Sequence, residues 1–265
     1  MLEMFEYDFM QRAFLAGMII AILASVSGTF VVLKRYSMIS ETLAHSALVG
    51  VAVGLVAGYN PLWMAVVVAL ISAWLIEYLR SSFSLYSDAI LAILLSGSLA
   101  IAVIIVSLGG AFNNSLFSYL FGSILSVSDE DVVTILVFGS ISLALLLAFS
   151  KELYFIAYDE EVAKTSGIRV KFLNYLLVSV VAIIIALSIR VVGSLLIGAL
   201  MVIPTVSALQ FKVGFLSTML ISLIIAIISV IAGMTLSFYF SLPSGATIVI
   251  CVLAVFIISL VANKK

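Results

Sequence analysis

Residues 37–58 read SMISETLAHSALVGVAVGLVAG, and apart from Glu41 and His45 no side chain in this run is ionisable. A helix needs about 20 predominantly apolar residues to cross the hydrocarbon core of a bilayer, so the run is long enough to span it. Glu41 and His45 stand four positions apart, which places them on the same face of a helix. The stretch therefore predicts a transmembrane helix with a carboxylate and an imidazole on one face.

The composition of the whole chain agrees with a membrane protein. Of the 265 residues, 65% are hydrophobic and 9% are charged, and the mean hydropathy is +1.39. Such values are typical of integral membrane proteins. The formal net charge of -1 gives nucleic-acid binding no electrostatic support. The lone cysteine, Cys251, excludes a disulfide within the chain and a cysteine-based metal cluster.

Nine apolar segments are long enough to cross the membrane. They cover residues 10–33, 37–58, 61–79, 89–110, 131–150, 172–189, 191–211, 214–236 and 243–262. Residues 115–127 are also apolar but too few to span, which favours a re-entrant or interfacial position. Pro204 lies inside the seventh segment and predicts a kink or a break, so this segment could turn back instead of crossing. We therefore expect an all-α bundle of eight or nine transmembrane helices in one domain, residues 1–265.

Basic residues gather on one side of the membrane when these segments alternate. That side receives Lys34, Arg35, Arg80, Lys151, Lys164, Arg169, Lys171, Lys212, Lys264 and Lys265, while only Arg12 and Arg190 fall on the other. Cytoplasmic loops carry an excess of lysine and arginine. The more basic side is therefore predicted to be cytoplasmic, with the N-terminus outside and the C-terminus inside.

An ionisable residue at hydrocarbon depth is costly, by about 2.5–3.5 kcal/mol at the helix centre, and usually marks function. Glu41 and His45 lie about one and two turns inside the cytoplasmic end of their segment, where together they could hold a divalent metal. The structural alternative is that Glu41 reaches the headgroups near Lys34 or Arg35 while neutral His45 hydrogen-bonds a neighbouring helix. Asp88, at the start of the fourth segment, is a third candidate ligand, although capping of that helix alone would explain it.

Two polar clusters lie between the segments. On the outer side, residues 126–131 (SVSDED) form either an N-cap with acidic first-turn residues or a docking or cation site. On the inner side, residues 158–167 (YDEEVAKTSG) predict a short amphipathic helix with Asp159 as its cap and an ion pair between Glu160 and Lys164. This helix is either a connector or a contact surface for a soluble subunit.

Six stretches occur in the order found in the membrane permeases of zinc and manganese ABC importers, the ABC-3 metal permease family. They are residues 40–46 (SETLAHS), 88–91 (DAIL), 119–122 (YLFG), 158–167, 192–204 (VGSLLIGALMVIP) and 242–245 (LPSG). The chain resembles this family from about residue 12 to 262 and is most similar to its zinc-type members.

The resemblance implies a multi-pass protein of the inner (plasma) membrane that transports but does not catalyse. It implies a homodimer, a cytoplasmic ATPase dimer and an extracytoplasmic metal-binding protein as partners. The transported ion would be Zn²⁺, with Mn²⁺ or Fe²⁺ as alternatives, and no cofactor would be bound permanently.

The resemblance also assigns roles to individual residues. Glu41 and His45 become ligands on the ion pathway, where the family usually has aspartate in place of this glutamate. The side chain of glutamate is one methylene longer than that of aspartate, which affects the coordination geometry and the metal preference of this site. Ser123 stands where zinc-type relatives often carry an acid. Residues 205–217 look like the loop that meets the ATPase, with Thr205, Ser207, Gln210, Phe211 and Lys212 as its contacts.

Two functions from other classes compete with this interpretation. A secondary transporter driven by protons could use Glu41 and His45 as a proton relay, and it would work without an ATPase. An intramembrane metalloenzyme would need several metal ligands. The chain has one histidine and no His-Glu-x-x-His motif, so it provides too few. The chain has no Gly-x-x-x-x-Gly-Lys-Ser/Thr loop either, so any ATP would be bound by another chain.

Overall fold

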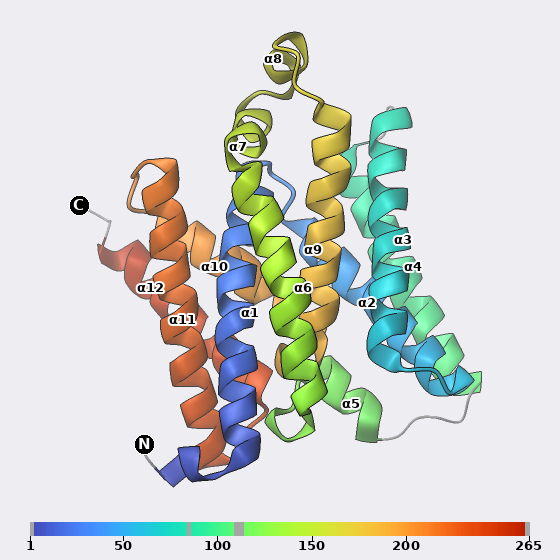
Figure 1. Cartoon of the computed structure of the whole chain (residues 1–265), viewed down its shortest axis with the longest axis vertical. Coiled ribbons are helices and arrows are strands. Elements are labelled where there is room, and N and C mark those ends of the chain that lie inside the picture. The colour runs from blue at the N-terminus through green and yellow to red at the C-terminus, as the bar shows by residue number, and fades with distance from the viewer. Residues whose placement is uncertain (1–2, 84–85, 109–113, 263–265) are drawn as a thin grey trace.

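The computed structural model describes residues 3–83, 86–108 and 114–262, which form helices and turns but no strand (Figure 1). In these residues eight helices are long and apolar enough to cross a membrane: α1 (Asp8–Leu33), α2 (Met38–Ala57), α3 (Pro61–Ser82), α4 (Ser87–Leu108), α6 (Asp129–Ala148), α9 (Val170–Val192), α11 (Phe215–Phe240) and α12 (Ser244–Ala262). Shorter helices are α5 (Asn114–Phe121), α7 (Ser150–Tyr158), α8 (Glu160–Thr165) and α10 (Ile197–Leu209), with 3-10 turns η1 (Glu3–Glu6) and η2 (Ile124–Ser126). The predicted polytopic helical bundle is confirmed.

The choice between eight and nine spans depends on α10. Its 13 residues rise about 20 Å, less than the roughly 30 Å of the hydrocarbon core. The helix runs through Pro204, and the break that separates it from α9 lies upstream at Gly193, whose φ is 91°. The predicted break was therefore wrong in position. It falls at Gly193 because the next two backbone N–H groups leave the helix and donate to the carbonyls of Tyr119 (2.9 Å) and Leu120 (3.2 Å) in α5.

Three helices form the interior of the bundle. Most residues of α1, α2 and α9 are buried, whereas α3, α4, α6, α11 and α12 leave large apolar side chains exposed. In Figure 1, α1 and α9 stand in the middle, with α11 and α12 on one side and α2 to α4 on the other. The exposed apolar surface suits contact with lipid chains. α8 lies at one end of the bundle and α5 at the other.

Some predictions are tested only in part, and others concern residues outside the described ranges. α5 has eight residues and is confirmed as too short to span, but its depth in the membrane stays a prediction. The orientation of the termini also stays a prediction. Lys264, Lys265 and the last two residues of the predicted segment 89–110 lie outside the described residues.

A charge cluster joins α3 to α8 at the end predicted to be cytoplasmic. The Arg80 guanidinium donates two hydrogen bonds to the carboxylate of Glu77, at 2.7 and 3.0 Å, and one to Glu160 at 3.3 Å. Glu77 is 1% exposed, while Glu160 also pairs with Lys164. The short helix predicted in residues 158–167 is confirmed as α8, with Asp159 as its cap, since this side chain accepts two backbone N–H bonds, and with the predicted ion pair between Glu160 and Lys164.

Replacing Glu77 with glutamine is expected to lower the free energy of unfolding by about 3 kcal/mol, because it leaves the Arg80 charge partly buried without its main partner. Thermal unfolding in detergent would show this as a lower midpoint. Glu161→Gln is the matched control, since Glu161 is exposed on α8 and makes no ion pair within the described residues. Equal midpoints for the two variants would contradict the prediction.

Candidate functional site

His45 lies inside the bundle on α2, with its side chain buried among neighbouring helices. The residue is 5% exposed, and its Nδ1 atom is buried with no hydrogen-bond partner among the described residues. In the predicted alternative neutral His45 hydrogen-bonds a neighbouring helix, and Nδ1 makes no such bond to the described residues. A buried polar atom without a partner is costly and calls for an explanation such as an unseen ion or a functional role.

The hydroxyl groups beside His45 are satisfied within the protein. Thr42 donates to the carbonyl of Met38 at 2.9 Å or of Leu91 at 3.3 Å, and the Ser46 hydroxyl lies 2.9 Å from that of Ser98. These bonds hold α2 against α4. The free nitrogen of His45 is therefore not part of this packing network.

Glu41 lies in the first turn of α2, one helical turn before His45, and its side chain is exposed in the single chain. The start of α10 approaches it closely, since a Cβ atom at Gly198 would lie 3.7 Å from the Glu41 Cα atom. The absence of a side chain at Gly198 leaves room beside the backbone of Glu41. Glu41 has no salt bridge within the described residues, so it does not pair with Lys34 or Arg35.

Asp88 occupies a different environment from His45. It is exposed at the start of α4 and lines a cavity of about 380 Å³ with the basic residues Lys34, Arg35 and Arg80. Burial, followed by the nearby Arg80 charge, lowers the pKa of Lys34 to about 8. Neither Glu41 nor His45 lines this cavity, so the structure does not bring the third candidate ligand to the other two.

The described residues contain no group of three or more His, Cys, Asp or Glu side chains that could hold a metal ion. One chain therefore offers Glu41 and His45 as a pair of ligands. A bound divalent ion would take its remaining ligands from water or from another chain.

The predicted ATPase contacts divide into two groups. Thr205 and Ser207 are fully buried in α10, where Thr205 lies 3.1 Å from the Ser222 hydroxyl and Ser207 donates to a backbone carbonyl. Phe211 and Lys212 are exposed in the turn that follows α10, and Gln210 is half-buried. Of the five predicted contact residues, Phe211 and Lys212 in this turn are therefore accessible to another protein, whereas Thr205 and Ser207 are not.

Two of the three acidic residues in the first turn of α6, Asp129 and Asp131, form ion pairs within the chain. Ser128 and Asp131 form a capping box, which confirms the N-cap alternative. Arg12 pairs with Asp129 at 3.1 Å, and Arg190 pairs with Asp131 at 2.5 Å. Arg190 also donates to the hydroxyl of Tyr119 in α5, a contact that the sequence analysis did not predict.

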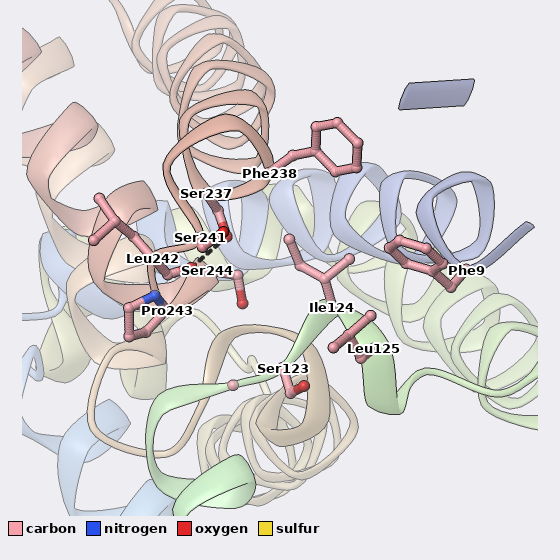
Figure 2. A pocket seen from close by; sticks show the side chains of 11 residues that line it. Phe9, Ser123, Ile124, Leu125, Ser237, Phe238, Ser241, Leu242, Pro243 and Ser244 are labelled. Atoms are coloured by element: carbon pink, nitrogen blue, oxygen red, sulfur yellow. Dashed lines mark hydrogen bonds between the residues drawn. The ribbon is translucent and has the colours of Figure 1, made fainter. Parts of the chain in front are cut away.

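A separate cavity of about 320 Å³ lies at the turn between α11 and α12 (Figure 2). Its side chains are apolar or carry hydroxyl groups, with Phe9, Ile124 and Phe238 around it and Ser237 bonded to the Leu242 carbonyl at 2.6 Å. Because no lining residue is charged, this cavity supplies no strong ligand for a metal ion.

Comparison with known proteins agrees with the helical bundle. The model of the ABC 3 transport family matches residues 6–263. The chain is 32% identical to the high-affinity zinc uptake system membrane protein ZnuB of Haemophilus influenzae, over 99% of this chain and 100% of that protein. It is 30% identical to the manganese import system permease protein ScaB of Streptococcus parasanguinis, over 98% and 92%.

A solved structure, PsaBC from Streptococcus pneumoniae in complex with Fab, superposes with a TM-score of 0.84 at 29% identity, covering 96% of this chain and 91% of that one. The family match and the common fold thus extend over nearly the whole chain. The chain belongs to the ABC 3 transport family.

Proposed function

We propose that the chain is the membrane-spanning permease of an ATP-driven importer of a divalent metal, most readily Zn²⁺. The observation that carries the proposal is His45, buried in α2 with a ring nitrogen that has no hydrogen-bond partner in the part of the chain that the structure describes. A metal ion passing this point would satisfy the nitrogen, and the carboxylate of Glu41 lies one turn away on the same helix.

The ligand chemistry suits a transported ion rather than a structural one. Imidazole nitrogen and carboxylate oxygen both bind zinc, and the same set accepts manganese or iron. Structural zinc sites are usually closed by four protein ligands, whereas the described residues of one chain offer two. A pair of ligands from one chain binds the ion more weakly than a closed site, which favours release when the pairs of two chains are apart.

A second copy of the chain would complete the pathway. Glu41 is exposed in the single chain, so an interface that covers this end of α2 would bring a second Glu41 and His45 close to the first pair. Alternating access of this shared site to the two sides of the membrane would then move the ion. The ATPase would dock on the turn at Phe211 and Lys212, and a metal-binding protein would deliver the ion from the outer side.

The experiment that tests the proposal is uptake of labelled zinc by proteoliposomes that contain the chain with its ATPase partner. We expect uptake only when ATP is present on the side of the membrane where the ATPase lies. We expect no uptake with a catalytically inactive ATPase or with the chain alone. Unlabelled manganese and iron as competitors would rank the three metals. Uptake by the chain alone, driven by a proton gradient, would contradict the proposal and establish a secondary transporter.

A further inference from the structure

A groove of about 660 Å³ runs along the beginning of α9, away from Glu41 and His45. Its lining residues are Lys164, Arg169, Val170, Lys171, Phe172 and Tyr175. Half of them are basic, none is acidic, and the others are apolar or aromatic. The groove therefore combines positive charge with an apolar surface.

The positive charge of the groove is largely uncompensated. Lys164 pairs with Glu160 at 3.3 Å. Arg169 and Lys171 are exposed, and within the described part of the chain neither makes an ion pair. Two free cations thus stand where α9, a candidate transmembrane helix, begins. By the distribution of basic residues, this end of α9 is predicted to face the cytoplasm.

The apolar surface of the groove continues along α9 towards the interior of the membrane. Tyr175 lies about 6 Å along the helix from Lys171, and Ser179 about 12 Å, at 1.5 Å per residue on the same face. There the indole of Trp74 from α3 donates to the Ser179 hydroxyl at 2.8 Å. Trp74 and Phe172 are 52% and 56% exposed, so an aromatic surface extends from the cations into the depth of the bilayer.

We propose that this groove binds one anionic phospholipid, with its phosphate between Arg169 and Lys171 and its acyl chain along Tyr175 and Trp74. Basic residues at the start of a membrane helix attract anionic lipid headgroups, and aromatic side chains are typical of this level of the bilayer. A free phosphate ion would use the cations alone, and an acidic protein segment would leave the apolar surface at membrane depth uncovered. A lipid uses both parts of the groove.

Native mass spectrometry of the full chain in detergent, titrated with dioleoyl-phosphatidylglycerol or dioleoyl-phosphatidylcholine, tests the proposal. We expect the first phosphatidylglycerol to bind several-fold more tightly than phosphatidylcholine. Lys171→Gln should weaken this binding about fivefold, the fold-change that corresponds to about 1 kcal/mol for each basic residue near anionic lipid. Lys171→Arg keeps the charge and should bind as wild type does.

Lys151→Gln is the matched control. Lys151 is the second residue of α7 as Lys171 is of α9, and both are exposed, but Lys151 does not line the groove. Its loss should leave lipid binding unchanged. An equal effect of the two substitutions, or equal affinity for the two lipids, would overturn the proposal. Competition by glycerophosphoglycerol, which lacks acyl chains, at the potency of the lipid would overturn it in favour of a free-anion site.

Discussion

His45→Ala is expected to reduce ATP-dependent metal uptake to below about one hundredth of the wild-type rate at equal abundance of the protein in the membrane. Changes to groups that only orient a metal ligand already cost 10- to 100-fold in affinity or activity, and this substitution removes the ligand itself. Assembly should persist, because the variant also removes a buried nitrogen that has no partner in residues 3–83, 86–108 and 114–262. Uptake of labelled zinc by the complete transporter would measure the effect.

Ser46→Ala is the matched control for His45→Ala. Ser46 is the next residue on α2, is equally buried, and bonds to Ser98. Its loss should cost about 1 kcal/mol of stability and leave uptake within about twofold of wild type. If the two substitutions reduced uptake equally, His45 would serve packing instead of transport. Normal uptake by His45→Ala would remove the residue from the pathway altogether.

Substitutions at Glu41 separate charge from geometry. Glu41→Gln keeps the length of the side chain but removes the charge, so uptake should fall at least tenfold if an ion passes the carboxylate. Glu41→Asp keeps the charge and shortens the reach by one methylene, and it should retain most uptake while changing the ranking of zinc against manganese. A ranking that stays the same would show that Glu41 does not contribute to selectivity.

Most of the fold follows from single segments of sequence. Each of the eight long helices is a nearly continuous apolar run, so its existence depends on the local sequence and on the thickness of the bilayer. The exception is α10. It is as apolar as the spanning helices, and hydropathy alone cannot show where it begins. Its start is set by Gly193 and by hydrogen bonds to carbonyls of α5, which are far away in the sequence.

The candidate site was predictable to the extent that it lies on one helix. The spacing of Glu41 and His45 predicts that they lie one turn apart on one helix, and both residues lie on α2, while their role as metal ligands stays a prediction. The surroundings of Asp88 and the pairing of Arg190 with Asp131 depend on contacts between distant segments, which periodicity does not encode. A usable signal did exist for Arg190, since the predicted topology places it on the same side of the membrane as the acidic residues 126–131.

Gly28→Ala is expected to destabilise the protein by about 3 kcal/mol or more. Gly28 lies in α1, and a Cβ atom there would stand 2.0 Å from the carbonyl oxygen of Met201 in α10 and 2.8 Å from its carbonyl carbon. A backbone atom cannot move away by rotation about a side-chain bond, so the two helices would have to separate. We expect this to cost at least the usual ~1–3 kcal/mol of overpacking. The thermal midpoint in detergent should fall accordingly.

Gly97→Ala supplies the comparison, because Gly97 also lies within a membrane helix, α4, and a Cβ atom there meets nothing within 4 Å. Its midpoint should stay the same or rise, since alanine favours helix over glycine by up to about 1 kcal/mol. Equal midpoints for the two variants would mean that α1 and α10 do not approach so closely. The contact has a consequence for transport as well. α10 begins at Ile197, and its second residue, Gly198, lies beside the backbone of Glu41, so a displaced α10 also changes the surroundings of Glu41. Any Gly28→Ala protein that still folds should therefore lose more uptake than its abundance in the membrane explains.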